Sequence, residues 1–364
     1  MKISHVIDEL VEERSLEAGV LGDIICEGLL SAFQKKYPNV IFKVIYDKKK
    51  DELGIFAEKT VVSAVDDTFT QISLRKARAI KESAKLDEVI LVPFDEPIGR
   101  IEILKAKQII AQRIRSVEAA AVYNEFKSKE GTLLVGTVHK AERNGMTVKI
   151  GETLAFLPKS LMIPGDKCVV GYTVRALLRE VLAEPRNDNQ LILDRSSKEF
   201  LVKLFELEIP EIYEKIVEIK RVARIPGYKS KIVVASHDKN IDPIGTCIGF
   251  GGARIKPVLR ELGLEKIDVI GEKESLGELV AESLKPAQVN RVDIINGKEA
   301  QVWVDADQRS LAIGKMGQNI RLASELTGVA INLMQSEGAQ AQLGGEGEGG
   351  QGQESDSDKV EWEL

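Results

Sequence analysis

Apolar residues recur at helical spacing at both ends of the first 126 residues. Up to Phe33 they are three or four positions apart, which predicts two short amphipathic helices, the second ending before Pro38. From Ile103 to Phe126 the same spacing returns, with Ala106, Ile110, Ile114, Val117 and Ala121 on one side. This pattern predicts a helical rod about 35 Å long that connects the first domain to the next.

Between these helices lie short runs of β-branched and aromatic residues. Val40–Tyr46 and Leu53–Ala57 flank a charged loop and predict a hairpin, and Glu88–Val92 predicts another strand. The first 129 residues are therefore expected to fold as an α+β domain.

From Glu130 to about Ser196, short β segments alternate with glycine-containing turns. Asn144-Gly145 and Pro164-Gly165 are typical turn pairs. The predicted strands are Leu133–His139, Met146–Ile150, Thr153–Pro158, Cys168–Arg175 and Gln190–Asp194. Five strands at this spacing favour a small OB-type barrel, although a small β-barrel that binds nothing fits the pattern equally well.

After Ser196 the chain contains the same unit twice. Ile248–Ile255 contains one G-x-x-G tetrad and Ile313–Ile320 another, and each is followed by Glu-Leu and then by an apolar strand. The offset between the copies is 65 residues before one indel and 64 after it, with the Glu-Leu pairs already at the shorter offset. Duplication of a unit of about 65 to 75 residues explains this pattern.

Each copy is predicted to run strand, helix, G-x-x-G loop, helix, strand, which is the KH arrangement. Glycine has no Cβ, so a phosphodiester can approach the main chain, where N–H groups at a helix start can bind its oxygens. The predicted RNA-binding residues are Gly249, Phe250, Gly251, Gly252, Arg254, Lys256, Gly314, Lys315, Met316, Gly317, Gln318, Asn319 and Arg321, with Lys229 and Lys231 beside them. The basic members of this set could equally be ordinary solvated surface.

Charge and composition narrow the class of protein. The net charge is −6, but residues 337–364 contain eight acids and one base, so the rest of the chain is close to neutral. Residues 221–335 have a net charge of only +2, and RNA binding should therefore depend on shape and stacking as well as on counterion release. The acidic, glycine-rich tail is predicted to be disordered, either as a solubilising segment or as a cover for the KH surface.

Catalytic and metal-binding classes find little support. The three cysteines are far apart, and only three histidines accompany them, so neither a zinc site, a disulfide framework nor any other cofactor is expected. The Gly-Lys pairs at 297–298 and 314–315 lack the upstream glycine of a P-loop. We expect a protein that is not an enzyme. Without a membrane-length apolar run or a signal peptide, it is expected in the cytoplasm.

Several segments resemble the NusA family of bacterial transcription elongation and termination factors. They are RIPGYKSKIVV from Arg224, NIDPIGTCIG from Asn240, AIGKMGQNIRLA from Ala312, LFELEIPEI from Leu204 and AEKTVV from Ala57. The resemblance implies a multidomain α+β chain: an N-terminal domain at 1–129, an OB fold of the ribosomal S-one type at 130–198, KH domains of the prokaryotic type at 199–277 and 278–336, and a tail at 337–364.

The resemblance also implies partners. The N-terminal domain would dock on DNA-directed RNA polymerase, the other domains would hold single-stranded nascent RNA, and the protein, a monomer, would act with other Nus antitermination factors on pausing, termination and antitermination. Arg195 matches a family arginine and is expected at the RNA interface. Two departures stand out: the family usually has a basic residue where Gly251 stands, and the barrel offers only Phe156 and Tyr172 for stacking on bases.

A second interpretation is an RNA-binding protein of the ribosome or of RNA processing with the same KH and OB modules. Such a protein would have no reason to contain the first 129 residues.

Overall fold

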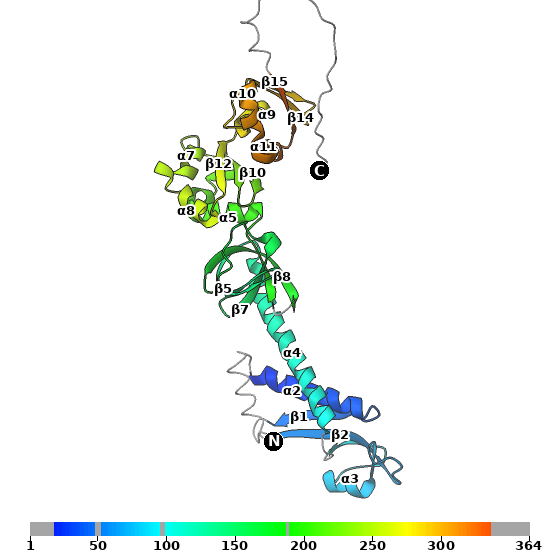
Figure 1. Ribbon diagram of the computed structural model, residues 1–364. Helices are drawn as coiled ribbons and strands as arrows, with labels where there is room; N and C mark the ends of the chain where they lie inside the picture. Colours follow the sequence, from blue (N-terminus) through cyan, green and yellow to red (C-terminus); the bar gives the residue numbers. More distant parts are fainter. Residues whose placement is uncertain (1–17, 48–51, 95–98, 187–188, 336–364) are drawn as a thin grey trace, which may run out of the picture. The chain divides into compact units, whose positions relative to one another are not determined.

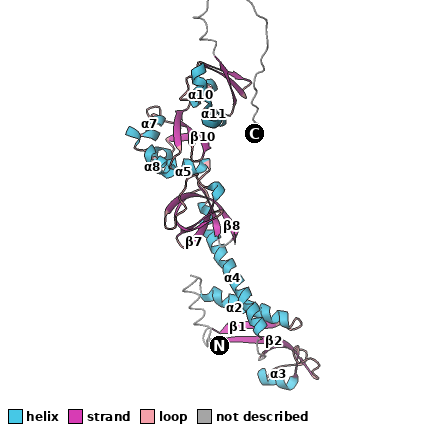
Figure 2. Cartoon of the chain, in the orientation of Figure 1, coloured by secondary structure: helices cyan, strands magenta, loops and turns pink. Residues whose placement is uncertain are grey.

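The computed structural model describes residues 18–47, 52–94, 99–186 and 189–335 (Figure 1). The chain forms two compact units, one comprising residues up to 162 together with 167–194, and the other residues 163–166 together with those from 195 onward. The first predicted amphipathic helix and the acidic tail lie outside the described residues. The helices and strands of each unit can be followed in Figure 2.

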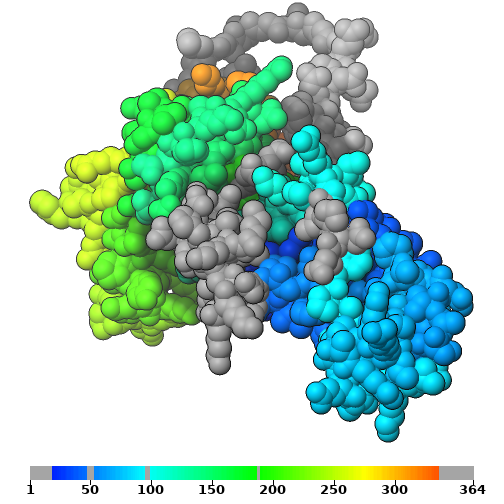
Figure 3. All heavy atoms as spheres, turned by 90° about the horizontal axis from the view of Figure 1, so that it is seen from below, coloured from blue at the N-terminus to red at the C-terminus, as the bar shows by residue number. Residues whose placement is uncertain are grey.

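The first unit begins with an α+β domain whose atoms gather in one lobe, blue to cyan in Figure 3. Its elements are α2 Ala18–Lys36, β1 Phe42–Asp47, β2 Glu52–Val62, β3 Gln71–Ser73, α3 Leu74–Ile80 and β4 Val89–Pro93. The long strand β2 pairs with β1 and β4 antiparallel and with β3 parallel, which confirms the predicted hairpin. Strand β3 and helix α3 were not predicted, because the polar residues around Asp66 and Asp67 conceal them.

Helix α4, Arg100–Phe126, is the predicted rod, beginning three residues earlier than expected. Its residue Ile114 packs into an apolar cluster with Leu21, Ile24 and Ile25 of α2. The two helices meet closely at Gly28, where an added Cβ would lie 2.3 Å from Cγ1 of Ile110. Only glycine allows the helices to come this close. The contact with α2 therefore holds the first half of α4 against the N-terminal domain.

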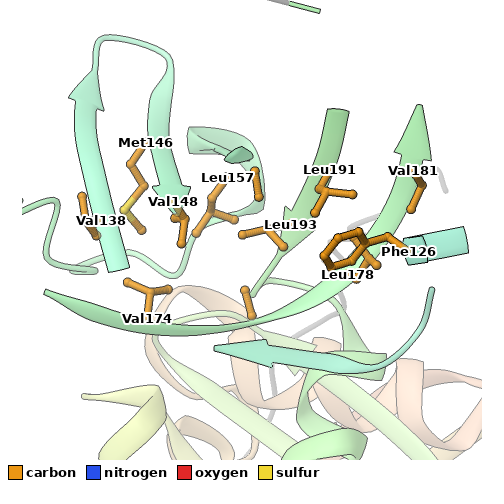
Figure 4. Packing of buried hydrophobic residues seen from close by; sticks show 12 residues of the cluster. Phe126, Val138, Met146, Val148, Leu157, Val174, Leu178, Val181, Leu191 and Leu193 are labelled. Carbon is orange, nitrogen blue, oxygen red and sulfur yellow. The ribbon is translucent and has the colours of Figure 1, made fainter. Parts of the chain in front are cut away.

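The C-terminal end of α4 packs against a closed five-stranded barrel. The barrel has the strand order β5-β6-β7-β9-β8, which confirms the OB-type prediction. The strands are β5 Leu133–Glu142, β6 Gly145–Ile150, β7 Thr153–Pro158, β8 Thr173–Arg186 and β9 Asn189–Asp194, with 3₁₀ turns η1 Lys127–Lys129 and η2 Lys159–Leu161. Phe126 lies in the barrel core with Leu178 and Leu191 (Figure 4). Nε2 of the buried Gln190 also donates to the carbonyl of Ala119 on α4 at 2.7 Å.

The fourth barrel strand differs from the prediction, which placed it at Cys168–Arg175. Residues 168–172 form a turn, where the Tyr172 amide donates to the Val169 carbonyl, and the strand runs instead from Thr173 to Arg186. It pairs with both β5 and β9, so it must be long. Its sequence from Ala176 to Glu184 is rich in helix formers, and burial in the barrel overrides that local preference.

The second unit contains the two KH copies, each with helical structure and one additional strand before the predicted elements. The first consists of α5 Lys198–Glu208, α6 Pro210–Tyr213, β10 Val217–Ile225, β11 Lys229–Ser236, α7 Pro243–Ile248, η3 Phe250–Gly252, α8 Ile255–Leu262 and β12 Lys266–Gly271. The second consists of α9 Leu276–Ser283, β13 Arg291–Ile295, β14 Glu299–Val304, α10 Ala306–Ile313, η4 Lys315–Gly317, α11 Gln318–Thr327 and β15 Ala330–Gln335. In both, the middle strand pairs antiparallel with the first strand and parallel with the third.

The structure also corrects the position of the indel between the copies. Helices α8 and α11 are each followed by a glycine cap, Gly263 and Gly328, which have φ values of 70° and 78° and are still 65 positions apart. The offset of 64 begins only at the next strand, at Lys266 and Ala330. The indel therefore lies after the helix, and the Glu-Leu pairs are not equivalent positions.

The two KH copies share part of their core. Ala223, Val233 and Ile270 of the first copy form one buried cluster with Leu279, Leu322 and Leu326 of the second. Nη1 of Arg221, on β10, donates to the Thr327 carbonyl at the end of α11 at 2.9 Å. Because α11 begins at the second G-x-x-G loop, this contact ties that loop to the first copy.

Candidate nucleic-acid interface

Each G-x-x-G loop forms a tip between two helices, α7 and α8 in the first copy and α10 and α11 in the second. The leading glycines adopt nearly the same conformation, with φ and ψ of 71° and 168° at Gly249 and 72° and 177° at Gly314. An added Cβ would lie 2.9 Å from Cγ of Arg254 in the first tip and 2.6 Å from Cβ of Asn319 in the second. Backbone conformation and lack of space both require glycine here.

The main-chain amides of the two tips are arranged alike. The glycines at the first and fourth positions of each tetrad donate their N–H to nearby carbonyls. Gly249 donates to Gly245, Gly252 to Gly249, Gly314 to Ser310 and Gly317 to Gly314, at 2.7 to 3.2 Å. Within the described part of the chain, no backbone acceptor is recorded for the N–H groups of the two middle residues of either tetrad. Neighbouring N–H groups in such a turn can bind one anion. Each tip can therefore accept a phosphate.

Arg254 positions the first tip from the start of α8. Its Nη1 donates to the Thr246 carbonyl at 3.2 Å and to both carboxylate oxygens of Glu211 at 2.8 Å. Burial opposes ionisation of Glu211, yet the hydrogen bond from Arg254 keeps the pKa of that carboxyl below its usual value. The charge of Arg254 is thus largely neutralised by a carboxylate that the sequence analysis did not identify.

Asn319 occupies the equivalent position in the second tip, 65 residues later. Its amide donates to the carbonyl of Leu311, which is equivalent to Thr246, and to those of Ala312 and Leu284 at 3.0 to 3.3 Å. The residue is only 6% exposed. We therefore place Asn319, like Arg254, among the residues that shape the tip, instead of among those expected to touch RNA.

The two predicted lysines on β11 are engaged by one carboxylate. Asp268, on the neighbouring strand β12, lies 2.7 Å from Nζ of Lys229 and 2.8 Å from Nζ of Lys231. Lys231 has no exposed surface, and burial lowers its pKa despite the Asp268 hydrogen bond. The expected phosphate contact of Lys231 is therefore replaced by a structural role: the side chain also donates to the Lys285 carbonyl at 3.4 Å.

Arg195 is likewise buried, at 4% exposure. Its guanidinium is paired with Asp166 at 2.9 Å and Glu261 at 2.6 Å and lies over the ring of Phe200. Burial opposes its charge, but these carboxylates hold the pKa of Arg195 above its usual value. In this position it joins the 163–166 segment to the end of α8 and does not face an RNA strand.

The remaining predicted residues are accessible at the tips. Phe250 is 101% exposed and Met316 is 86% exposed. Lys256, Lys315 and Arg321 are exposed as well, and Gln318 is half-buried. In the barrel, Tyr172 is 48% exposed and Phe156 is half-buried. Each tip thus combines two open main-chain amides with an accessible cation within one helical turn.

Sequence reasoning missed the carboxylates that hold the predicted cations. The signal for Asp268 was present but needed the strand register, because Lys231 and Asp268 are partners in the parallel β11–β12 pair. Glu211 could be found only from the packed structure, since it lies 43 residues before Arg254. Across the described ranges no three potential ligands cluster as a metal site, and no helix there is long and apolar enough to span a membrane.

A closed OB-type barrel and a tandem pair of KH domains with open glycine tips define a multidomain RNA-binding regulatory protein. Family models agree with this class. The NusA N-terminal domain matches residues 2–120, the NusA-like first KH domain residues 195–272, and the NusA-like second KH domain residues 276–341.

Whole-chain relatives extend the match. The chain is 36% identical over 349 residues to the transcription termination/antitermination protein NusA of Thermus thermophilus, covering 90% of this chain and 89% of that protein. It is 34% identical over 345 residues to the protein of the same name from Rickettsia conorii, covering 93% and 68%. The chain therefore belongs to the NusA family and is a transcription termination/antitermination factor.

A NusA domain is among the solved structures that are similar to part of this chain. The solution structure of the N-terminal domain of NusA from B. subtilis shares 25% identity, covers 31% of this chain and 92% of that domain, and has a TM-score of 0.24.

Proposed function

We propose that the two KH tips hold single-stranded nascent RNA while the N-terminal domain docks on RNA polymerase, and that the chain thereby modulates pausing, termination and antitermination. The observation that carries the RNA half is the repeated tip, with two open main-chain amides at matched positions in both copies. The chain would act without chemistry of its own, as a cytoplasmic monomer working with other Nus factors.

Two tips in one packed body favour binding of one extended strand. Once one tip holds the RNA, the second meets the same strand at a high effective concentration, so the pair binds more tightly than either tip alone. The shared buried cluster around Leu322 and the Arg221 contact support this arrangement, because both keep the copies from moving apart. The near-neutral charge of this region makes shape and stacking important.

The polymerase half rests on the family match of residues 2–120 and on exposed apolar side chains of the same domain. Val89 and Leu91, which lie on one face of strand β4, are 56% and 36% exposed. Exposed apolar residues on one face of a small domain are suited to docking against another protein. In this proposal the domains end at residues 129, 198, 277 and 336.

The RNA half is tested by placing aspartate at the middle positions of both tips: Phe250→Asp and Gly251→Asp, with Lys315→Asp and Met316→Asp. Like charges at the open amides should repel phosphate and weaken single-stranded RNA binding at least tenfold in fluorescence anisotropy. Lys298→Asp, in the exposed β13–β14 turn, is the control for a general charge effect. Unchanged affinity in a folded tip variant would refute RNA binding at the tips.

The polymerase half is tested on a template with a hairpin-dependent pause. The intact chain should lengthen or shorten the pause, and a version cut before Glu130 should lose this effect while keeping RNA affinity. A pull-down with core RNA polymerase should retain only the intact chain. If core polymerase is not retained and the pause is unaltered, the chain is better assigned to ribosomal or RNA-processing complexes.

A further inference from the structure

The two tips present different side chains on the same backbone. Their middle residues are Phe250-Gly251 in the first copy and Lys315-Met316 in the second. The second middle residue is left-handed in both, with φ and ψ of 58° and 22° at Gly251 and 55° and 30° at Met316. Because the main chains match, any difference in binding between the tips must come from side chains.

Phe250 is the most exposed large apolar residue in the described structure, at 101% of its reference area. A phenylalanine in this position gains no burial on folding and leaves its whole ring in water. It stands next to the open amide of Gly251, where a phosphate would bind. A nucleotide held by that amide would carry its base within reach of the ring.

The accessible cations are distributed unequally. Beside the first tip, Lys256 is exposed on α8, whereas Arg254 is paired with both oxygens of Glu211. At the second tip, Lys315 and Arg321 are both exposed, and the structure records no ion pair for either among the described residues. The second tip thus offers one more available positive charge, located in the tetrad itself.

We infer that the two tips hold RNA by different contacts: a base stacks on Phe250 of the first tip, and Lys315 of the second tip binds a phosphate. This inference rests on the proposed RNA binding and specifies its chemistry. Stacking is insensitive to salt, since no counterion is released, whereas each neutralised phosphate of a single strand contributes about −0.7 to the slope of log K against log salt.

The test measures affinity of the full chain for a single-stranded RNA of about 12 nucleotides over a series of salt concentrations. Phe250→Ala should weaken binding by about 5- to 150-fold, the range expected for one lost base–aromatic stack, and leave the slope unchanged. Lys315→Ala should reduce the slope by about 0.7. Leu264→Ala, which removes an 87% exposed leucine outside the tips, and Lys298→Ala are the matched controls and should change neither quantity.

Abasic nucleotides identify the partner of the ring. Scanning one abasic position along the RNA should reveal a site whose loss weakens the intact chain as much as Phe250→Ala does, and which no longer matters in that variant. The reciprocal change completes the test: Phe250→Lys should steepen the slope by about 0.7, and Lys315→Phe should make it shallower by the same amount.

The outcomes separate this inference from the proposed function. Failure of the intact chain to bind RNA would overturn both. If the intact chain binds RNA but Phe250→Ala binds it equally well, only the assignment of different contacts to the two tips is overturned. The same holds if abasic RNA does not reproduce the loss in Phe250→Ala, or if the salt slope changes in Phe250→Ala and not in Lys315→Ala. A Phe250→Ala variant that alters pausing at unchanged RNA affinity would also overturn that assignment, since the ring would then contact a protein.

Discussion

Replacing Glu265 with glutamine should destabilise the first KH domain severely. The carboxylate has no exposed surface and accepts four hydrogen bonds: from Nε and Nη2 of Arg224 at 2.9 and 3.0 Å, from the Gly227 amide at 2.9 Å and from the Ser230 hydroxyl at 2.6 Å. Arg224 is itself 1% exposed. Glutamine would leave its guanidinium buried without a counter-charge, and such a loss costs about 3 to 5 kcal/mol.

That loss is a large share of the stability of a small domain, which is about 5 to 15 kcal/mol. With a urea dependence of about 2 kcal/mol per molar, the unfolding midpoint of this domain should fall by about 2 M. The chain contains several domains, and circular dichroism reports on all of them at once, so the assay also needs a probe in the first KH domain. The thiol of Cys247, buried in the same domain, provides one through its rate of alkylation.

A double variant provides a second test of the Arg224–Glu265 pair. Arg224→Met with Glu265→Leu should be less destabilised than either single variant, because two apolar side chains leave no unpaired charge. Lys298→Gln, in an exposed turn, controls for loss of a charged group. If Glu265→Gln unfolds at the wild-type urea concentration, the pair is not the constraint that the geometry indicates.

Three further predictions concern single side chains. Burial lowers the pKa of Lys231, so between that lowered value and 10.5 the unfolded chain binds more protons than the folded chain. The stability of the wild type relative to Lys231→Met should therefore rise as the pH increases through this window. Urea unfolding midpoints of both proteins, measured at about pH 7 and about pH 10, test this. Burial also raises the pKa of Cys247 to about 12, so native protein near neutral pH should be alkylated at Cys247 far more slowly than at the exposed Cys168, with equal rates in urea. Gly314→Ala should destabilise the fold by about 1 to 3 kcal/mol and weaken RNA binding. Gly297→Ala is the control for backbone strain alone, because Gly297 has a similar φ of 68° but no atom within 4 Å of an added Cβ. Equal effects of the two substitutions in thermal unfolding would rule out the steric clash at Gly314.

The duplicated tips were predictable because their signal is local. Spacing within the G-x-x-G tetrads and the apolar positions of the following helix determine the loop between two helices, and these need no knowledge of distant residues. The matching conformations of Gly249 and Gly314 confirm the predicted equivalence. The first predicted strand hairpin and the long helix α4 were found for the same reason.

Local sequence could not show whether each predicted cation is exposed to solvent or buried in an ion pair. Lys231 and Arg195 can be buried in their charged forms because carboxylates 37 and 66 residues away pair with them in the folded chain. A basic residue beside a glycine loop looks the same in sequence whether it faces solvent or an aspartate on the next strand. Strand β8 shows the related limit for secondary structure, since pairing on both sides decides its conformation against its own helix preference.

The cluster shared by the two KH copies also means that neither copy is a separable module. Cutting the chain between them would leave Ala223, Val233 and Ile270 facing water on one piece, and Leu322 and Leu326 on the other. Each piece would lose apolar contacts that its own small core cannot replace. A premature stop or a protease cut between the copies should thus yield an insoluble remnant and not a half-strength binder, and selection would act on the duplicated pair as one inherited unit.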